Sequence, residues 1–96
     1  MPKLISIQNK VYSLENYVYD DHMFVRCYNI EPEYRGRRYS YRIFDKLLTK
    51  YKKSIILECY FTLLPYYQKL GFKILEQEDN QGYYAMIKEY EYEEQT

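Results

Sequence analysis

Short apolar runs, separated by polar or turn-forming residues, occupy most of this chain and predict strands. The runs are rich in β-branched and aromatic residues, which favour strands. They lie at residues 4–7, 11–18, 23–30, 54–61, 72–78 and 82–90. We expect the first two runs to form a hairpin around residues 8–10, and the last two to be joined by a turn at residues 79–82.

The middle of the chain follows a helical period instead. Apolar residues recur there three and four positions apart, at Ile43, Phe44, Leu47, Leu48 and Tyr51. This spacing places them on one face and predicts a helix over residues 38–51.

A second, shorter helix is expected to contain residues 65–70. Pro65 is tolerated in a first helical turn, and Thr62 is a candidate N-cap. Gly71 is a typical C-terminal stop.

The order of these elements predicts an α+β fold in a single domain over residues 1–96. The run Ile55-Ile56-Leu57 is apolar on both faces, as in a central and often parallel strand. A strand, the long helix and this strand would form a parallel β-α-β crossover. We therefore expect a mixed, mostly antiparallel sheet with a central parallel crossover and two helices.

Length and composition limit the kind of protein. A chain of 96 residues fits one small domain of modest stability, so pairing as a homodimer would help it. The hydrophobic content of 47% is enough for a core. There are 15 tyrosines and no tryptophan, and we expect most tyrosines at half-buried positions.

Charge is balanced overall but uneven along the chain. Fourteen basic and fourteen acidic residues cancel, which predicts no polyanionic partner. Arg38, Arg42, Lys46 and Lys50 lie four positions apart and would form a basic stripe on the long helix. Nucleic-acid binding through this stripe is conceivable, but the zero net charge and the acidic C-terminal residues argue against it.

Cysteine and histidine usage gives no sign of a metal or disulfide site. Cys27 and Cys59 both fall in strand-like runs, where free cysteines are usually small core residues. With one histidine, no metal-ligand spacing is recognisable, and no metal is expected. No run is long and apolar enough for a membrane span or a signal peptide, so a reducing cytoplasm is the expected location.

Two stretches carry recognisable motifs. YNIEPEYRGRRYSYRIFDKLL, at residues 28–48, joins a strand end, an arginine-rich turn and a helix. PYYQKLGFKILE, at residues 65–76, joins a short helix, a glycine and a strand. In this order they resemble the GNAT family of N-acetyltransferases, which transfer an acetyl group from acetyl-CoA to an amine. The resemblance implies a three-layer GNAT-like domain that is short at its N-terminus.

The first stretch is similar to the family's acetyl-CoA loop, Arg/Gln-x-x-Gly-x-Gly/Ala, but departs from it. Arg35 matches the first position. Arg38 stands where a glycine is expected, and Ser40 stands where the family has glycine or alanine. Gly36 is offset and fills neither place. The side chain of Arg38 could crowd the phosphate cradle or contact a phosphate itself.

By resemblance, acetyl-CoA would lie between the strand ending at Ile30 and the strand ending near Cys59. Its pantetheine arm would hydrogen-bond the backbone near Asn29 and Ile30. Its pyrophosphate would rest on the backbone N–H groups of the loop, namely those of Arg35, Gly36, Arg37, Arg38, Tyr39, Ser40 and Tyr41.

Cations around a helix start need an explanation, because that end of a helix already attracts anions. Arg35, Arg37, Arg38 and Arg42 would deepen the preference for a phosphate. Alternatively, Arg37, Arg38 and Arg42 are solvated and pair with nearby carboxylates at Glu31, Glu33 or Asp45.

Tyr67 aligns with the tyrosine that serves many family members as general acid, and Tyr66 competes for the role. A general base is harder to assign. Glu58 near the end of its strand is one candidate, and Glu31 and Glu33 are others.

Three functions follow from these patterns. The first is an N-acetyltransferase with an amine acceptor, either a protein lysine or N-terminus or a small amine. The second is a GNAT-like module that has lost catalysis and binds CoA or another protein. Arg38 in place of glycine motivates it. The third, nucleic-acid binding, is the least favoured.

Overall fold

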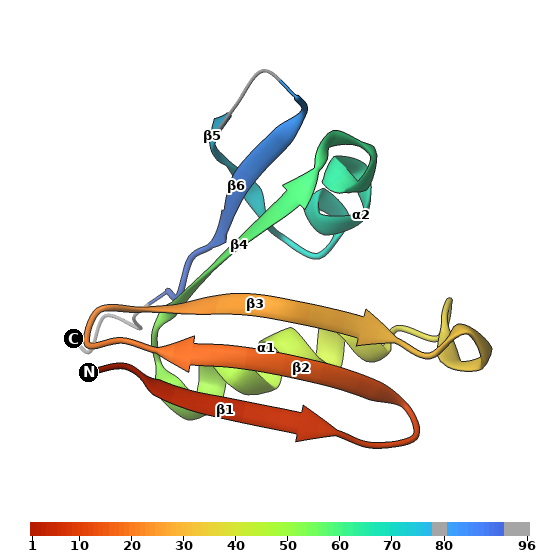
Figure 1. The fold of residues 1–96 in the computed structure, drawn as a ribbon, viewed down its shortest axis with the longest axis horizontal. Helices are drawn as coiled ribbons and strands as arrows, with labels where there is room; N and C mark the ends of the chain where they lie inside the picture. Colours follow the sequence, from red (N-terminus) through yellow and green to blue (C-terminus); the bar gives the residue numbers. More distant parts are fainter. Residues whose placement is uncertain (78–80, 92–96) are drawn as a thin grey trace.

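The structure is a computed structural model that describes residues 1–77 and 81–91. Its centre is a six-stranded sheet in the order β1-β2-β3-β4-β6-β5 (Figure 1). The strands are β1 (Lys3–Gln8), β2 (Tyr12–Val18), β3 (His22–Ile30), β4 (Ser54–Tyr60), β5 (Lys73–Gln77) and β6 (Tyr83–Lys88). The β3–β4 pair is parallel and the other pairs are antiparallel. The predicted α+β class and the central parallel crossover are therefore confirmed.

Two helices and two 3-10 turns connect the strands. They are η1 (Pro32–Tyr34), α1 (Tyr39–Tyr51), η2 (Phe61–Leu63) and α2 (Leu64–Lys69). In the described part of the chain, no helix combines the length and apolarity that a bilayer crossing requires.

Both predicted hairpins are present as antiparallel strand pairs. In the first, the side-chain oxygen of Asn9 accepts hydrogen bonds from the backbone N–H groups of Val11 and Tyr12, at 2.9 and 3.0 Å. The second joins β5 to β6. Part of the turn expected at residues 79–82 lies outside the described residues.

The core lies between the sheet and both helices. Helix α1 buries Ile43, Phe44 and Leu47, which confirms the predicted apolar face. Phe44 is 1% exposed, and its ring packs against Tyr67 of α2 and against Phe72. Both helices therefore cover one face of the sheet. The described residues form two layers, rather than the three that the family resemblance implied.

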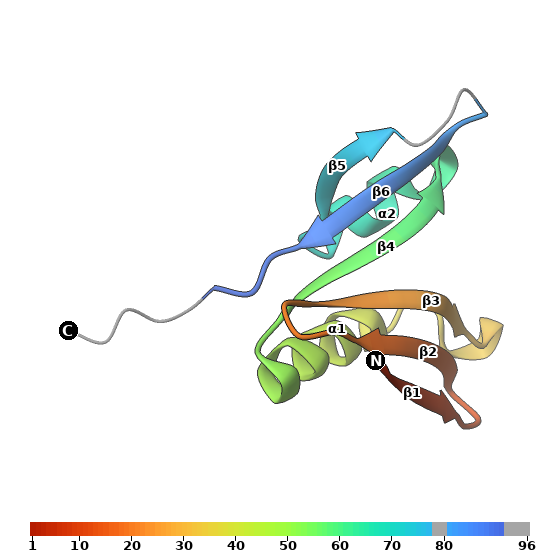
Figure 2. The same cartoon turned by 60° about the vertical axis from the view of Figure 1, so that its left-hand side comes forward.

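Strands β3 and β4 separate halfway along their length. Residues 22–25 of β3 pair with residues 54–57 of β4, and the pairing stops there. Glu15 of β2 lies opposite Cys27 and Asn16 lies opposite Val25, so Arg26 is an extra residue in β3. Such a bulge bends a strand. Beyond it the two strands diverge, as Figures 1 and 2 show.

The bulge at Arg26 also switches which β3 residues face the core. Val25 is buried before it and Ile30 is buried after it, although strict alternation would place them on opposite faces. Cys27 is consequently exposed, so the prediction that it lies in the core was wrong. Cys59 is buried as expected.

Helix ends account for two further corrections. Helix α1 begins at Tyr39, not at residue 38, so Arg38 precedes the helix and is not part of its face. Thr62 lies in η2, and the N-cap of α2 is Leu63, without a side-chain hydrogen bond. Gly71 does follow the last turn of α2, with φ of +95°. Its role as a stop is confirmed.

Candidate functional site

The loop before α1 presents backbone N–H groups that no side chain caps. Gly36 and Arg38 both have left-handed backbone conformations, with φ of +78° and +63°. Arg38 is the N-cap of α1 and makes no side-chain capping bond, and the first turn contains no acidic residue. The first N–H groups of a helix have no partner within the helix, and the helix dipole adds positive character there. This end of α1 is therefore suited to an anion.

The arginines around this loop are not neutralised by carboxylates. Within residues 1–77 and 81–91, none of the ion pairs includes Arg35, Arg37, Arg38 or Arg42. The carboxylate of Asp45 instead lies 3.9 Å from Nζ of Lys88. The alternative in which these arginines pair with Glu31, Glu33 or Asp45 is therefore not what the described structure shows. Arg37 instead lies over the ring of Tyr34, with its guanidinium 5.8 Å from the ring centre.

Arg35 ties the loop to the end of β3. Its Nε donates a hydrogen bond of 2.8 Å to the carbonyl oxygen of Ile30, and its terminal nitrogen Nη2 donates one of 3.1 Å to the side-chain oxygen of Asn29. The first residue of the loop motif thus fixes the two strand residues predicted to meet the pantetheine arm.

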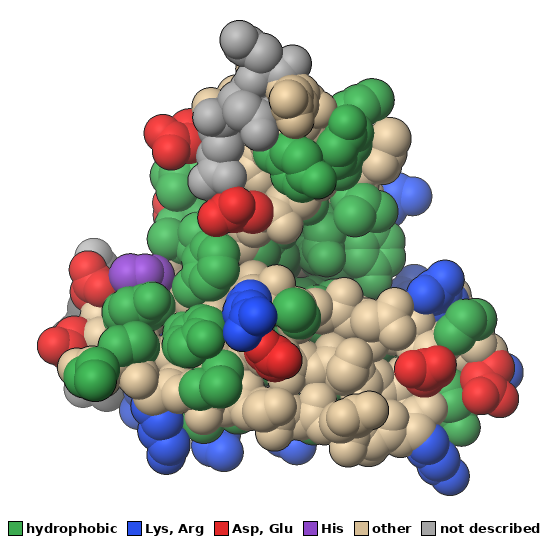
Figure 3. Space-filling model, viewed as in Figure 1, with side chains coloured by type: hydrophobic (Ala, Val, Ile, Leu, Met, Phe, Trp, Pro, Cys, Tyr) green, Lys and Arg blue, Asp and Glu red, His purple; other side chains and the backbone are tan. Residues whose placement is uncertain are grey.

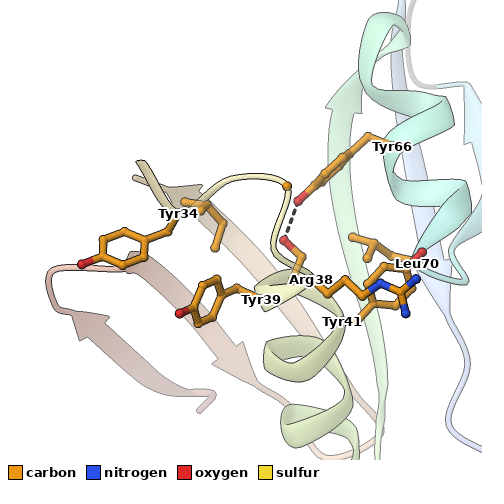
Figure 4. Close-up of a pocket in the computed structure, with 9 residues that line it drawn as sticks. Tyr34, Arg38, Tyr39, Tyr41, Tyr66 and Leu70 are labelled. Atoms are coloured by element: carbon orange, nitrogen blue, oxygen red, sulfur yellow. Dashed lines mark hydrogen bonds between the residues drawn. The ribbon is translucent and has the colours of Figure 1, made fainter. Parts of the chain in front are cut away.

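A hollow of about 180 Å³ lies at the start of α1. It is lined by the predicted phosphate-binding residues Gly36, Arg38, Tyr39, Ser40 and Tyr41, together with Ile30. Tyr66 and Leu70 line it from the α2 side. Figure 4 shows the side chain of Arg38 extending beside Tyr41 and Leu70 and away from Tyr34 and Tyr39.

Ser40 joins three elements through its hydroxyl. It is 7% exposed and forms hydrogen bonds with the hydroxyl of Tyr28 in β3, at 2.5 Å, and with that of Tyr66 in α2 (Figure 4). The side chain that replaces glycine or alanine in the loop pattern therefore belongs to a partly buried chain of three hydroxyl groups.

A second hollow of about 440 Å³ lies between the end of β3 and α2. Asn29, Ile30 and Arg35 line it from the strand side, and Tyr66 and Tyr67 line it from α2. Ile30, Gly36 and Tyr66 belong to both this hollow and the first, so the two adjoin.

A third hollow of about 420 Å³ occupies the gap between the separated ends of β3 and β4. Glu58 and Tyr60 line it from β4, Leu63 from η2 and Tyr83 from β6. Tyr67 lines both the second and the third hollow. The structure thus brings the predicted acid and the predicted base, Tyr67 and Glu58, to one cleft.

The environment of Tyr67 keeps its hydroxyl protonated. The residue is 8% exposed, and burial, followed by the nearby Tyr66 and Cys59, raises its pKa to about 12. No described residue forms a hydrogen bond with its hydroxyl. Tyr66, its competitor, is 43% exposed and bonded to Ser40. Tyr67 lines the cleft that contains Glu58 and Tyr66 does not, so the position of Tyr67 suits a proton donor better.

Other chemistry receives no support from the described residues. Burial raises the pKa of the Cys59 thiol, whose sulfur lies 3.5 Å from the sulfur of Met86. That environment disfavours a reactive thiolate. The described part of the chain contains no cluster of three His, Cys, Asp or Glu side chains that could hold a metal ion.

Buried tyrosines should make the protein sensitive to alkali. Burial raises the pKa of Tyr67 to about 12 and also raises that of Tyr28, whereas an unfolded tyrosine titrates near 10. Above about pH 10 the unfolded chain loses protons that the folded chain keeps, so the free energy of unfolding should fall until about pH 12. For Tyr67 alone the loss should be about 2–3 kcal/mol.

Urea unfolding at a series of pH values between about 8 and 12 measures this effect. The loss should be clearly smaller in Tyr67→Phe. An equal loss in that variant would show that Tyr67 does not cause it.

Comparison with known proteins identifies the fold. The sequence matches no protein-family model and none of the curated proteins with which it was compared. Among solved structures, it is similar to PaiA N-acetyltransferase from Thermoplasma acidophilum in complex with coenzyme A, with 20% identity and a TM-score of 0.67. It is also similar to the ribosomal-protein-S18-alanine N-acetyltransferase from Escherichia coli, with 14% identity and a TM-score of 0.70. A third match, from Bacteroides thetaiotaomicron, is described as a GNAT-family acetyltransferase, with 20% identity and a TM-score of 0.65.

The chain has the GNAT fold. It spans about half the length of two of these structures: 83% of this chain covers 54% of the PaiA structure, and 80% covers 53% of the Bacteroides structure. For the Escherichia coli enzyme, 95% of this chain covers 72% of that one. At these identities the likeness establishes the GNAT fold.

Some residues of this GNAT-like site could not be recognised from the sequence. Tyr28 reaches Ser40 because the bulge at Arg26 turns it towards α1. Tyr60, Leu63 and Tyr83 line the cleft because β4, η2 and β6 meet at its mouth. No pattern in the chain marks these contacts, since they join elements far apart in sequence.

The left-handed conformation of Arg38 gives a direct test of the predicted acetyl-CoA loop. An L-residue in this region is strained by about 1–2 kcal/mol, and glycine is not. Relief of this strain is partly offset, because glycine loses more conformational freedom on folding than arginine does. The net result should be a free energy of unfolding that is higher by about 0.5–1 kcal/mol in Arg38→Gly. If the loop holds acetyl-CoA as the family resemblance implies, affinity for acetyl-CoA should be kept or increased in this variant, because backbone N–H groups would hold the pyrophosphate.

Lys52, at the other end of α1, is a matched control. It also has positive φ, at +55°. Lys52→Gly removes the same kind of backbone strain far from the loop and should leave acetyl-CoA affinity unchanged. Urea unfolding and calorimetric titration measure the two quantities. A loss of affinity of about tenfold in Arg38→Gly alone would make the guanidinium a ligand.

Proposed function

We propose that this chain is an N-acetyltransferase that transfers an acetyl group from acetyl-CoA to an amine. The observation that carries the proposal is the uncapped start of α1. It is surrounded by arginines that form no ion pair with a described residue, and it adjoins the hollow between the end of β3 and α2. The PaiA structure that shares the fold is a complex with coenzyme A. The fold and the local electrostatics therefore both favour coenzyme A or its acetyl thioester as the ligand.

The residues present fit such a ligand. In this proposal the backbone N–H groups of residues 36–41 hold the pyrophosphate, which needs the left-handed turns that Gly36 and Arg38 supply. The pantetheine arm lies in the second hollow beside Asn29 and Ile30. Arg35 fixes these two residues and adds positive charge.

Acetyl-CoA supplies an activated acyl group as a thioester. During transfer its C–S bond breaks and an amide C–N bond forms. The amine nitrogen loses a proton, which Glu58 accepts directly or through water. The departing thiolate takes the proton of the Tyr67 hydroxyl. Both side chains line the cleft between the separated strands.

A binding module without turnover is the second candidate. The hydrogen bond between Ser40 and Tyr66 spans from α1 to α2 beside both ligand-binding hollows. If this bond stays closed, a cofactor could be held at the start of α1 while its thioester is kept away from the cleft that contains Tyr67 and Glu58. The two candidates differ in turnover, not in cofactor binding.

One experiment separates them. Acetyl-CoA is titrated into the purified protein by calorimetry, and free thiol release is then followed with peptides and small amines as acceptors. Binding with amine-dependent thiol release supports the transferase. Binding without release supports the module. Absence of binding contradicts the transferase and a module that holds CoA, and leaves only a module that binds another protein.

A further inference from the structure

An apolar rim borders the third hollow, the cleft between the separated ends of β3 and β4. Tyr60, Phe61, Leu63 and Tyr83, defined here as the apolar rim, are between 39% and 53% exposed. Figure 3 shows hydrophobic side chains gathered over the part of the molecule where Figure 1 places the end of β4 and α2. Concentrated exposed apolar surface of this kind commonly marks a binding site.

The rim is held in place although it is exposed. The ring of Tyr60 packs edge-on against Tyr83, with centroids 4.7 Å apart, and lies 5.4 Å from that of Phe61. The N–H of Phe61 donates a 2.7 Å hydrogen bond to the carbonyl of Gly82. A side chain at Gly82 would meet Phe61 at 2.9 Å. The rings are therefore positioned before any ligand arrives, which lowers the entropic cost of binding.

The cleft beneath the rim has a free negative charge. Arg26 and Glu58 are the charged side chains among the described residues that line it. Arg26 lies 3.2 Å from Glu15 of β2 and is compensated there. Glu58 is exposed and forms no ion pair with a described residue. A cation that enters the cleft would therefore meet an unpaired carboxylate and tyrosine ring faces.

We infer that the acceptor is the side chain of a lysine in an unfolded peptide segment with apolar residues beside that lysine. This inference rests on the proposed function, because it names the acceptor for the same site. The four-carbon stem of lysine suits walls formed by Tyr60, Leu63 and Tyr83, and its ammonium group suits Glu58. An α-amine would bring its own peptide groups between these apolar walls, where they would lack hydrogen-bond partners.

The rim also extends beyond the cleft, which favours a peptide over a small amine. Phe61 is 53% exposed and packs on Tyr60 without lining the cleft. A small amine in a cleft of about 420 Å³ would leave Phe61 uncovered. A peptide whose lysine enters the cleft would place its neighbouring side chains on the rim.

Three peptides test the inference. The first is N-acetylated and has one lysine between two leucines, and the second has serines in place of the leucines. The third lacks lysine and has a free α-amine. With saturating acetyl-CoA, KM for the first peptide should be about tenfold or more below that of the other two. Equal use of all three, or preference for the α-amine, would overturn the inference.

Variants of the rim give a second readout that does not depend on turnover. Binding of the fluorescein-labelled leucine peptide, measured by anisotropy, should weaken about fivefold or more in Phe61→Ser. Leu75→Ser is the matched control, since Leu75 is also 53% exposed but lies on β5, outside the cleft. It should bind like the wild type. Unchanged binding in Phe61→Ser, or an equal loss in both variants, would contradict the rim as a peptide site.

The two proposals can fail separately. If calorimetry shows no acetyl-CoA binding, the proposed function fails, whereas the peptide titration still decides whether the rim binds a lysine peptide. If acetyl-CoA binds and small amines are acetylated as well as the leucine peptide, the transferase remains and the peptide acceptor is excluded.

Discussion

Replacing Tyr67 with phenylalanine should slow acetyl transfer about 100-fold, which is the lower range for loss of a general acid. The affinity for acetyl-CoA should not change. The hydroxyl forms no hydrogen bond with a described residue, and the ring stays packed against Phe44 and Phe72, so the variant removes the proton and little else. Thiol release gives the rate, and calorimetric titration gives the affinity.

Tyr66→Phe is the control for this prediction. It removes a hydroxyl from the adjacent residue and breaks the bond to Ser40, but in this mechanism it leaves the acid in place. Turnover should fall much less than in Tyr67→Phe. Normal turnover in Tyr67→Phe, or a large loss confined to Tyr66→Phe, would remove Tyr67 from its proposed role.

Replacing Phe44 with alanine should lower the free energy of unfolding by about 3–5 kcal/mol. Phe44 is 1% exposed, and its ring contacts Tyr28, Tyr67 and Phe72, with centroids 4.9 to 6.4 Å away. It therefore connects α1 with β3, with α2 and with the start of β5. A domain of this size has a total stability of about 5–15 kcal/mol, so a large part of it depends on this ring.

Lys46→Ala tests whether the loss is specific to burial. Lys46 lies on the same helix and is exposed. Its replacement should change the stability by less than about 0.5 kcal/mol. Urea unfolding of both variants gives the comparison. A loss below about 1 kcal/mol in Phe44→Ala would contradict the described core.

Local patterns in the sequence were sufficient to predict the elements of this fold. The run Ile55-Ile56-Leu57 marked the central strand, and the spacing of Phe44 and Leu47 marked the buried face of α1. Both signals reflect how side chains alternate along a strand or repeat around a helix. They are therefore readable without knowledge of the tertiary structure.

The bulge at Arg26 could not be read in this way. It depends on how β2 pairs with β3, which is a tertiary property, and no glycine or proline marks it. Because the bulge shifts the alternation by one residue, Cys27 is exposed where an ideal strand would bury it. The same shift turns Tyr28 towards Ser40.

The candidate site was predicted from a family resemblance in its loop and in Tyr67, and the structure adds how these parts are arranged. The sequence suggested that Arg38 replaces a glycine, but its left-handed backbone is a result of the fold. Thr62 was a wrong N-cap because η2 extends the chain past it before α2 begins. The cofactor contacts assigned to residues 29, 30 and 35–41 stay predictions.

The most direct test of the central proposal is an NMR titration of ¹⁵N-labelled protein with coenzyme A. If a pyrophosphate rests on the start of α1, the largest amide shifts should fall on Gly36, Tyr39, Ser40 and Tyr41. Amides at the far end of α1, near Lys50, should move little. Saturating shifts that fall elsewhere and leave the residue 36–41 amides unmoved, or no shifts at millimolar coenzyme A, would contradict the proposal.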